Sequence, residues 1–88
     1  MCEIGGLYEI VWEDVLSGGS LWTDLSEIKK EVKDTKMLFK SVGYVVHITK
    51  GRIIIAATLD YGGEMVDATI GHWIAIPHVL IREIEKLN

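Results

Sequence analysis

The residues best suited to binding a ligand form a short run near the N-terminus. Trp12, Asp14 and Ser17 are close neighbours in sequence, and Trp22 follows after a glycine-rich gap. Tryptophan offers a flat face and one donor, aspartate offers acceptors, and serine offers both. This combination suits a pocket that stacks a planar ring. The competing interpretation, which the sequence alone favours, places both tryptophans in the core and makes Asp14 or Ser17 a loop cap.

Positive charge is concentrated in one segment. Seven of the nine basic residues lie between Lys29 and Arg52, where the only acids are Glu31 and Asp34, whereas the whole chain carries a net charge of −4. A solvated face explains such a run most simply. The alternative is a local phosphate or carboxylate site, with Lys50 and Arg52 as anion partners. The overall negative charge argues against long nucleic acid or anionic lipid as a partner.

Catalytic and metal-binding signatures are missing from the sequence. It contains no G-x-S-x-G, no phosphate-binding G-x-x-x-x-G-K-[ST], no G-x-G-x-x-G and no H-E-x-x-H. His47, His72 and His78 are scattered, so we expect no zinc site. His72 follows a glycine and precedes a tryptophan, which suits a ligand contact, although a hydrogen-bonded strand histidine is commoner. We therefore predict a protein that is not an enzyme and has no cofactor.

The size and composition predict one domain over residues 1–88. Hydrophobic residues make up 49% of the chain, which is much apolar side chain for so small an interior. We expect part of that surface to be buried between subunits of a homo-oligomer. The longest apolar run, Ile53 to Ala57, is too short to cross a membrane, and Met1 to Gly6 is not a signal sequence. With Cys2 as the only cysteine, the chain is expected in the cytoplasm.

The first half of the chain predicts a strand, a loop and a helix. Leu7 to Val15 alternates as a strand, with Tyr8, Ile10 and Trp12 on one side. Residues 17–20 form a Gly/Ser loop. A helix is expected from Asp24 to about Thr35, capped by Thr23. Its short apolar stripe predicts that it lies across the open end or side of a sheet; the stripe consists of Leu25, Ile28 and Val32.

The second half predicts further strands, over residues 37–49, 52–59 and 65–76, joined by turns at 50–51 and 60–63. Gly43 suggests a bend or bulge in the first of these strands. That strand is expected to place four residues on one face, namely Val42, Tyr44, Val46 and Ile48. The tail after Pro77 fits either a helix or a single turn followed by a closing strand over 80–87. The fold expected is a small antiparallel barrel of about five strands with one helix after the first.

Several short motifs resemble those of a family of small uncharacterised proteins of bacteriophages and prophages. They are W-x-D-x-x-S from Trp12 to Ser17 with a later tryptophan, V-G-Y at 42–44, and a late I-P followed by I-x-x-I. The second tryptophan comes one residue late, and His78 stands where a lysine is usual. The strand order resembles SH3-like and Sm-like barrels. The resemblance to the phage family implies no enzyme activity, and the resemblance to the barrels implies a closing strand at the tail and, for Sm-like barrels, assembly into rings.

These observations lead to two competing functions. The first is a phage-encoded module that sequesters a nucleotide-type signal of host defence. Its base would stack on Trp12 or Trp22, and its phosphates would meet Lys50, Arg52 or lysines of the helix, from the same or a neighbouring subunit. The alternative is a protein–protein module that inhibits or adapts a host or virion protein through the same aromatic residues. An RNA-binding Sm-like ring is a third option, and the net acidity argues against it.

Overall fold

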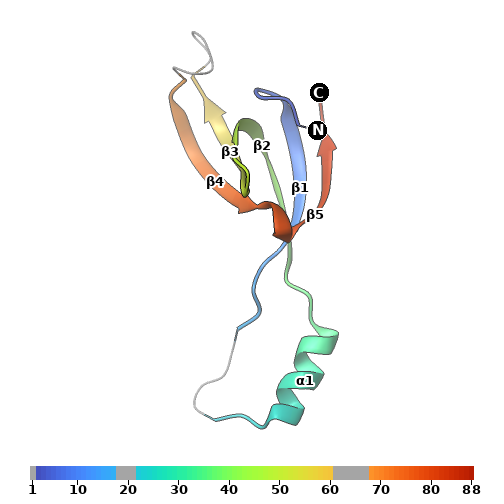
Figure 1. Ribbon diagram of the computed structural model, residues 1–88. Coiled ribbons are helices and arrows are strands. Elements are labelled where there is room, and N and C mark those ends of the chain that lie inside the picture. The colour runs from blue at the N-terminus through green and yellow to red at the C-terminus, as the bar shows by residue number, and fades with distance from the viewer. Residues whose placement is uncertain (1, 18–21, 61–67) are drawn as a thin grey trace.

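The chain folds into one curved antiparallel sheet with a helical extension. The computed structural model describes residues 2–17, 22–60 and 68–88. Five strands lie in the order β4-β3-β2-β1-β5 (Figure 1). The elements are β1 (Leu7–Glu13), α1 (Leu25–Asp34), β2 (Leu38–Ile48), β3 (Arg52–Leu59), β4 (Ile70–Pro77), the 3-10 helix η2 (His78–Leu80) and β5 (Ile81–Lys86). The predicted fold class is thereby confirmed: mainly β, with five antiparallel strands and one short helix after the first.

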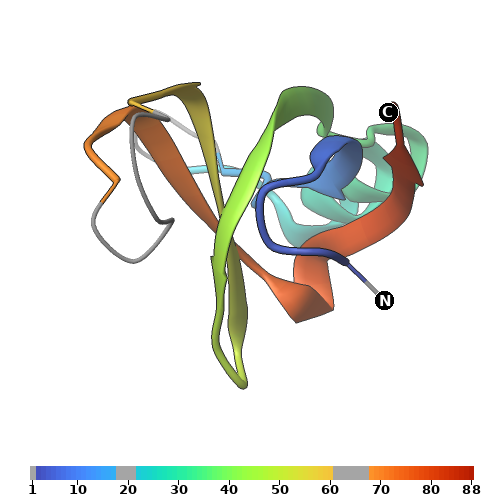
Figure 2. The same cartoon turned by 90° about the horizontal axis from the view of Figure 1, so that it is seen from above.

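The tail forms a closing strand, which settles the alternative left open by its periodicity. After Pro77 the chain makes one 3-10 turn and enters β5, which pairs antiparallel with β1. Seen from above, the sheet curls strongly and the chain passes from β4 through η2 to β5 across its end (Figure 2). This arrangement is compatible with an SH3-like or Sm-like barrel.

The core lies on the concave side of the sheet, where alternate residues of the strands meet. Tyr8 and Ile10 of β1 are buried, as the alternation predicted, and Trp12 packs against them from the same face. The buried cluster is completed by Val45, Ile53, Ile55 and Ile76. The turn predicted at 50–51 is confirmed and leads directly into β3. The turn predicted at 60–63 and the start of the strand predicted from Met65 lie mostly outside the described residues.

Strand β2 departs from the predicted pattern in two places. The irregularity in its pairing with β3 falls between Val45 and His47, not at Gly43. Because a bulge inserts one extra residue, Ile48 turns to the core side, while Val42 to Val46 keep their alternation. The prediction that Ile48 shares a face with Val42 is therefore wrong.

The helix is the main correction to the predicted architecture. Instead of lying across the sheet, α1 projects away from it on a long arm, which we define as the described residues 15–17 and 22–37 (Figure 1). No residue of α1 is buried in the described structure. The N-cap is Asp24, one residue later than the predicted Thr23, whereas the end at Asp34–Thr35 agrees with the sequence. The apolar stripe thus has no partner among the described residues of the same chain.

Candidate functional site

A pocket opens between the N-terminal segment and the last strand. Its volume is ≈ 530 Å³, within the range of about 300–1,000 Å³ typical of small-molecule sites. Its walls come from the segment before β1, from β1, β2, β3 and β5, and from η2. The lining residues are Cys2, Glu3, Tyr8, Ile48, Ile53, His78, Ile81, Ile84 and Lys86.

The lining of the pocket is largely apolar. Four isoleucines and the ring of Tyr8 contribute to it, and Ile53 and Tyr8 also belong to the buried core. The Tyr8 hydroxyl accepts a hydrogen bond of 2.8 Å from the backbone nitrogen of Glu3. The backbone nitrogen of Gly5 donates to the carbonyl oxygen of Val45, at 2.6 Å. Together these bonds hold the N-terminal segment along one side of the pocket.

An ion pair lies at the rim. The Lys86 Nζ atom is 2.7 Å from Glu3 Oε2, and both side chains are exposed to solvent. The hydrogen bond from Lys86 holds the pKa of the Glu3 carboxyl below its usual value, and the same bond raises the pKa of the Lys86 ammonium. Both groups are therefore charged at neutral pH. Lys86 is the lysine in the pocket lining, so its ammonium group is the cation that an anionic ligand would meet there.

Cys2 is a poor candidate for chemistry in this pocket. Burial raises the pKa of its thiol, and the positive N-terminus opposes this only in part. A raised pKa keeps the thiol protonated at neutral pH, whereas nucleophilic attack and metal binding both need the thiolate. The Cys2 side chain therefore contributes a small apolar surface to the pocket lining.

The basic turn predicted as an anion site adjoins this pocket. The His78 ring Nε2 lies 3.1 Å from the carbonyl oxygen of Thr49. The His78 backbone nitrogen donates to the carbonyl oxygen of Gly51, at 2.9 Å. Lys50 lies within this turn, and Arg52 follows it and pairs with Pro77. The fold thus places Lys50 and Arg52, both exposed, beside a residue that lines the pocket.

Trp12 has a structural environment. It lies half-buried on β1, and its Nε1 donates to Ser41 Oγ of β2 at 3.0 Å. Its ring centroid is 5.2 Å from that of Phe39, with the two planes tilted by 30°. The indole thereby satisfies its donor and covers the end of the core.

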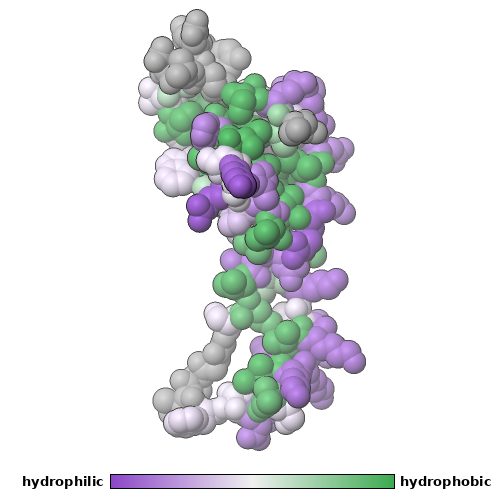
Figure 3. Space-filling model, viewed as in Figure 1, coloured by the Kyte–Doolittle hydropathy of each residue, from purple (hydrophilic) through white to green (hydrophobic). Residues whose placement is uncertain are grey.

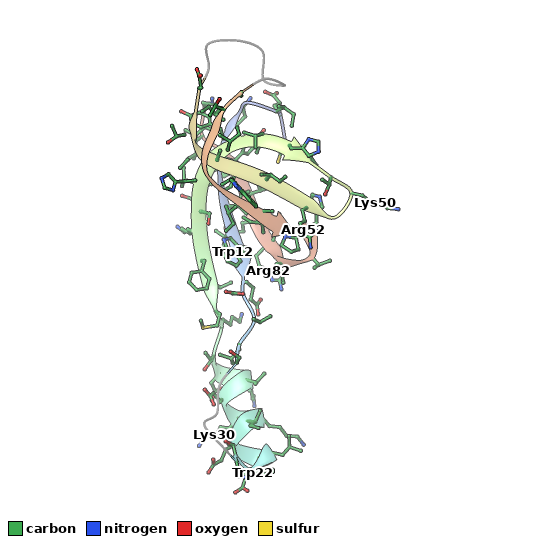
Figure 4. All side chains as sticks on the ribbon, turned by 90° about the vertical axis from the view of Figure 1, so that its left-hand side faces the viewer. Trp12, Trp22, Lys30, Lys50, Arg52 and Arg82 are labelled. Atoms are coloured by element: carbon green, nitrogen blue, oxygen red, sulfur yellow. The ribbon has the colours of Figure 1, made fainter. Side chains whose placement is uncertain are left out.

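The other residues of the predicted site lie along the arm or at its root. Asp14 Oδ1 accepts a hydrogen bond of 2.7 Å from the backbone nitrogen of Val15, as a local loop cap does. Ser17 is exposed. Trp22 is 96% exposed and lies at the far end of the arm (Figure 4). One chain therefore places Lys50 and Arg52 in and after the turn whose backbone His78 contacts, but it separates Trp22 from Trp12 and from both basic residues.

Sequence reasoning missed the pocket because its residues resemble ordinary core. Alternating isoleucines mark a buried strand face, and that pattern says nothing about a gap between two faces. The one available signal was His78, an isolated polar residue between Pro77 and an apolar tail. In the ranges that the structure describes, no group of three or more His, Cys, Asp and Glu side chains is placed to hold a metal ion.

Comparisons with protein-family models, with curated proteins and with solved structures found no match for this chain. Among the described residues, no helix combines the length and apolar character that crossing a bilayer requires.

Proposed function

We propose that this protein is a non-catalytic binding module that holds a small nucleotide-type ligand in the pocket beside β5. The observation that supports it is a largely apolar pocket of ligand size whose lining includes Lys86. A base would pack against the isoleucines and Tyr8. A phosphate would meet Lys86 at the rim, and Lys50 and Arg52, in and after the turn that His78 contacts, would be further anion partners.

The chemistry of the lining supports binding rather than catalysis. Acid–base or nucleophilic catalysis needs a poised group next to a partner that activates it. In the pocket, the Cys2 thiol is held protonated and the Glu3 carboxylate is paired with Lys86. The His78 ring faces a backbone carbonyl. These pairings leave the lining residues suited to recognition.

The resemblance to phage and prophage proteins extends the proposal to a biological role. A small, non-catalytic protein made during infection is suited to sequestering a nucleotide signal that host defence produces. The protein would act in the cytoplasm of the infected cell. Sequestration requires only affinity, so it agrees with a site that is built for binding alone.

Native mass spectrometry of the protein purified from host cells tests the proposal directly. We expect a retained small molecule whose mass matches that of a nucleotide. Calorimetry with linear and cyclic nucleotides should then give its affinity. Lys86→Ala should weaken binding about tenfold or more, because a hydrogen bond to a charged group contributes about 1.5–3 kcal/mol.

Lys40→Ala is the matched control, because Lys40 also pairs with a glutamate, Glu9, at 3.8 Å, but lies outside the pocket lining. It should leave the affinity unchanged. The proposal is overturned if no nucleotide binds, or if Lys86→Ala and Lys40→Ala have equal effects.

The outer face of the sheet favours a second candidate, a module that binds a host or virion protein. On this face, Tyr44 and Trp73 lie on either side of the fully buried Ala56, across β2, β3 and β4. Trp73 is 65% exposed, and exposed tryptophans dominate protein interfaces. If this candidate is correct, Trp73→Ala should abolish binding of the partner and Lys86→Ala should not.

A further inference from the structure

The chain exposes far more surface than a self-sufficient domain of its size. Its accessible surface is 6863 Å². A compact monomer of 9.9 kDa exposes about 5,200 Å², so the excess is roughly 1,700 Å². The Cα radius of gyration is 16.9 Å, against about 12 Å for a compact chain of this length. A specific interface buries about 800 Å² on each partner. The excess is therefore large enough for a stable interface with a second chain.

The arm exposes large apolar side chains. Leu25, Ile28 and Val32 are 63%, 42% and 56% exposed, although they form the apolar stripe of α1. Figure 3 shows apolar side chains gathered on one side of the arm and charged ones on the other. An isolated helix of ten residues is marginal in water. A partner that covers this stripe would stabilise the helix as well.

The spacing of the stripe is that of a two-stranded coiled coil. Leu25 and Val32 occupy successive a positions and Ile28 the d position between them. Such a narrow seam suits another helix better than it suits a broad sheet face. The spacing of the stripe therefore indicates that another helix covers it.

The charges beside the stripe indicate that the covering helix is a copy of α1 in the same direction. Asp24, the N-cap, and Glu31 occupy the g positions, and Lys29 occupies the e position within α1, which ends at Asp34. Parallel pairing sets g of one helix against the e position five residues later in the other. Asp24 then faces Lys29 of the second copy. Antiparallel pairing would set acid against acid and lysine against lysine.

We propose that this protein is a homodimer in which the two arms pack in parallel through their apolar stripes about a two-fold axis. None of the residues in this seam lines the pocket. Loss of the dimer would therefore not by itself contradict the ligand site, and loss of ligand binding would not contradict the dimer.

The mass of the protein in solution tests the dimer. Sedimentation equilibrium at micromolar concentration should give twice the 9.9 kDa of one chain. Ile28→Asp should give a monomer whose circular dichroism keeps its β-sheet signal, because the sheet core does not include the arm. A wild-type monomer throughout the concentration range, or an Ile28→Asp variant that stays dimeric, overturns the proposal.

A charge exchange tests the seam itself. Lys29→Glu makes the three flanking positions 24, 29 and 31 all acidic, and Asp24→Lys/Glu31→Lys makes them all basic. Each alone should dissociate at a concentration at least about tenfold above the wild type, and an equimolar mixture should form the heterodimer. Lys30→Glu makes the same charge change outside the seam, and Lys30 lies on the arm far from the sheet (Figure 4). If this control dissociates as readily, or the mixture fails to pair, the seam is misassigned.

The direction of the two helices has its own test. In a parallel pair, position 25 of one copy lies opposite position 25 of the other. Leu25→Cys in a Cys2→Ser background should therefore oxidise to a covalent dimer under mild conditions. A dimer that does not crosslink, while Ile28→Asp still dissociates it, contradicts the parallel arrangement.

Discussion

Gly43 in β2 lies so close to Ala56 in β3 that a β-carbon at position 43 would be 2.8 Å from the Ala56 carbonyl oxygen. The adjacent residue, Tyr44, is the register partner of Ala56, and Ala56 itself is fully buried. The two strands therefore approach each other closely at a buried position of the sheet. Because the neighbouring atoms are backbone, they cannot move aside as a flexible side chain would.

We expect Gly43→Ala to lower the free energy of unfolding by about 1–3 kcal/mol, the usual cost of overpacking. Gly51→Ala is the matched control, since no atom lies within 4 Å of a β-carbon built there. Its effect should stay within about 0.5 kcal/mol. Urea titration of both variants measures the difference. Equal stabilities would show that the two strands are not held this close.

Asp14 caps its own loop, so its removal should affect stability and leave binding intact. Asp14→Ala removes the acceptor for the Val15 backbone nitrogen. We expect a loss of about 0.5–1 kcal/mol in the free energy of unfolding, as for a partly exposed cap. The affinity for a ligand of the pocket should not change. Loss of binding without loss of stability would instead place the site at Trp12 to Ser17.

His72 has φ of 53°, a left-handed conformation that suits glycine, and its side chain is exposed. We expect His72→Gly to raise the free energy of unfolding by about 1 kcal/mol, because it relieves backbone strain. His47→Gly, at an exposed position of β2, should lower it by about 0.5–1 kcal/mol, because glycine weakens an ordinary strand. Thermal unfolding distinguishes the two. A destabilised His72→Gly variant would mean that the histidine makes a favourable contact.

The Glu3–Lys86 pair predicts how the pocket rim responds to pH. Lys86 lowers the pKa of Glu3, so the stabilisation is present above the ordinary value of 4.5 and is lost as the pH falls through the lowered value. Glu3 raises the pKa of Lys86, so the stabilisation is present below 10.5 and is lost as the pH rises through the raised value. The ion pair between Glu3 and Lys86 should therefore persist between these limits.

A carboxyl titration followed by NMR checks this behaviour. Glu3 should titrate below 4.5 in the wild type, and its midpoint should rise in Lys86→Ala. Lys40→Ala, which removes a lysine paired elsewhere, should leave the Glu3 midpoint in place. If the titration midpoint of Glu3 is the same in the wild type and in Lys86→Ala, the ion pair does not persist in solution.

Local patterns in the sequence were sufficient for the strands and for the class of fold. Alternation correctly placed Tyr8 and Ile10 on the buried face of β1, because successive strand residues point to opposite sides. Lys50–Gly51 correctly marked the turn into β3, which begins at Arg52 as predicted. These features depend on neighbours in the chain, and the residue types there determine them.

Only the tertiary structure decided which elements meet. Periodicity identified the stripe of α1 but not its partner, and the helix does not pack on the sheet of its own chain. The register shift after Val45 turned Ile48 inward, although no local pattern marks that position. The pocket joins Glu3 to Lys86, 83 residues apart, because β5 pairs with β1. Pairing between distant strands depends on the geometry of the whole sheet, and sequence spacing carries no record of it.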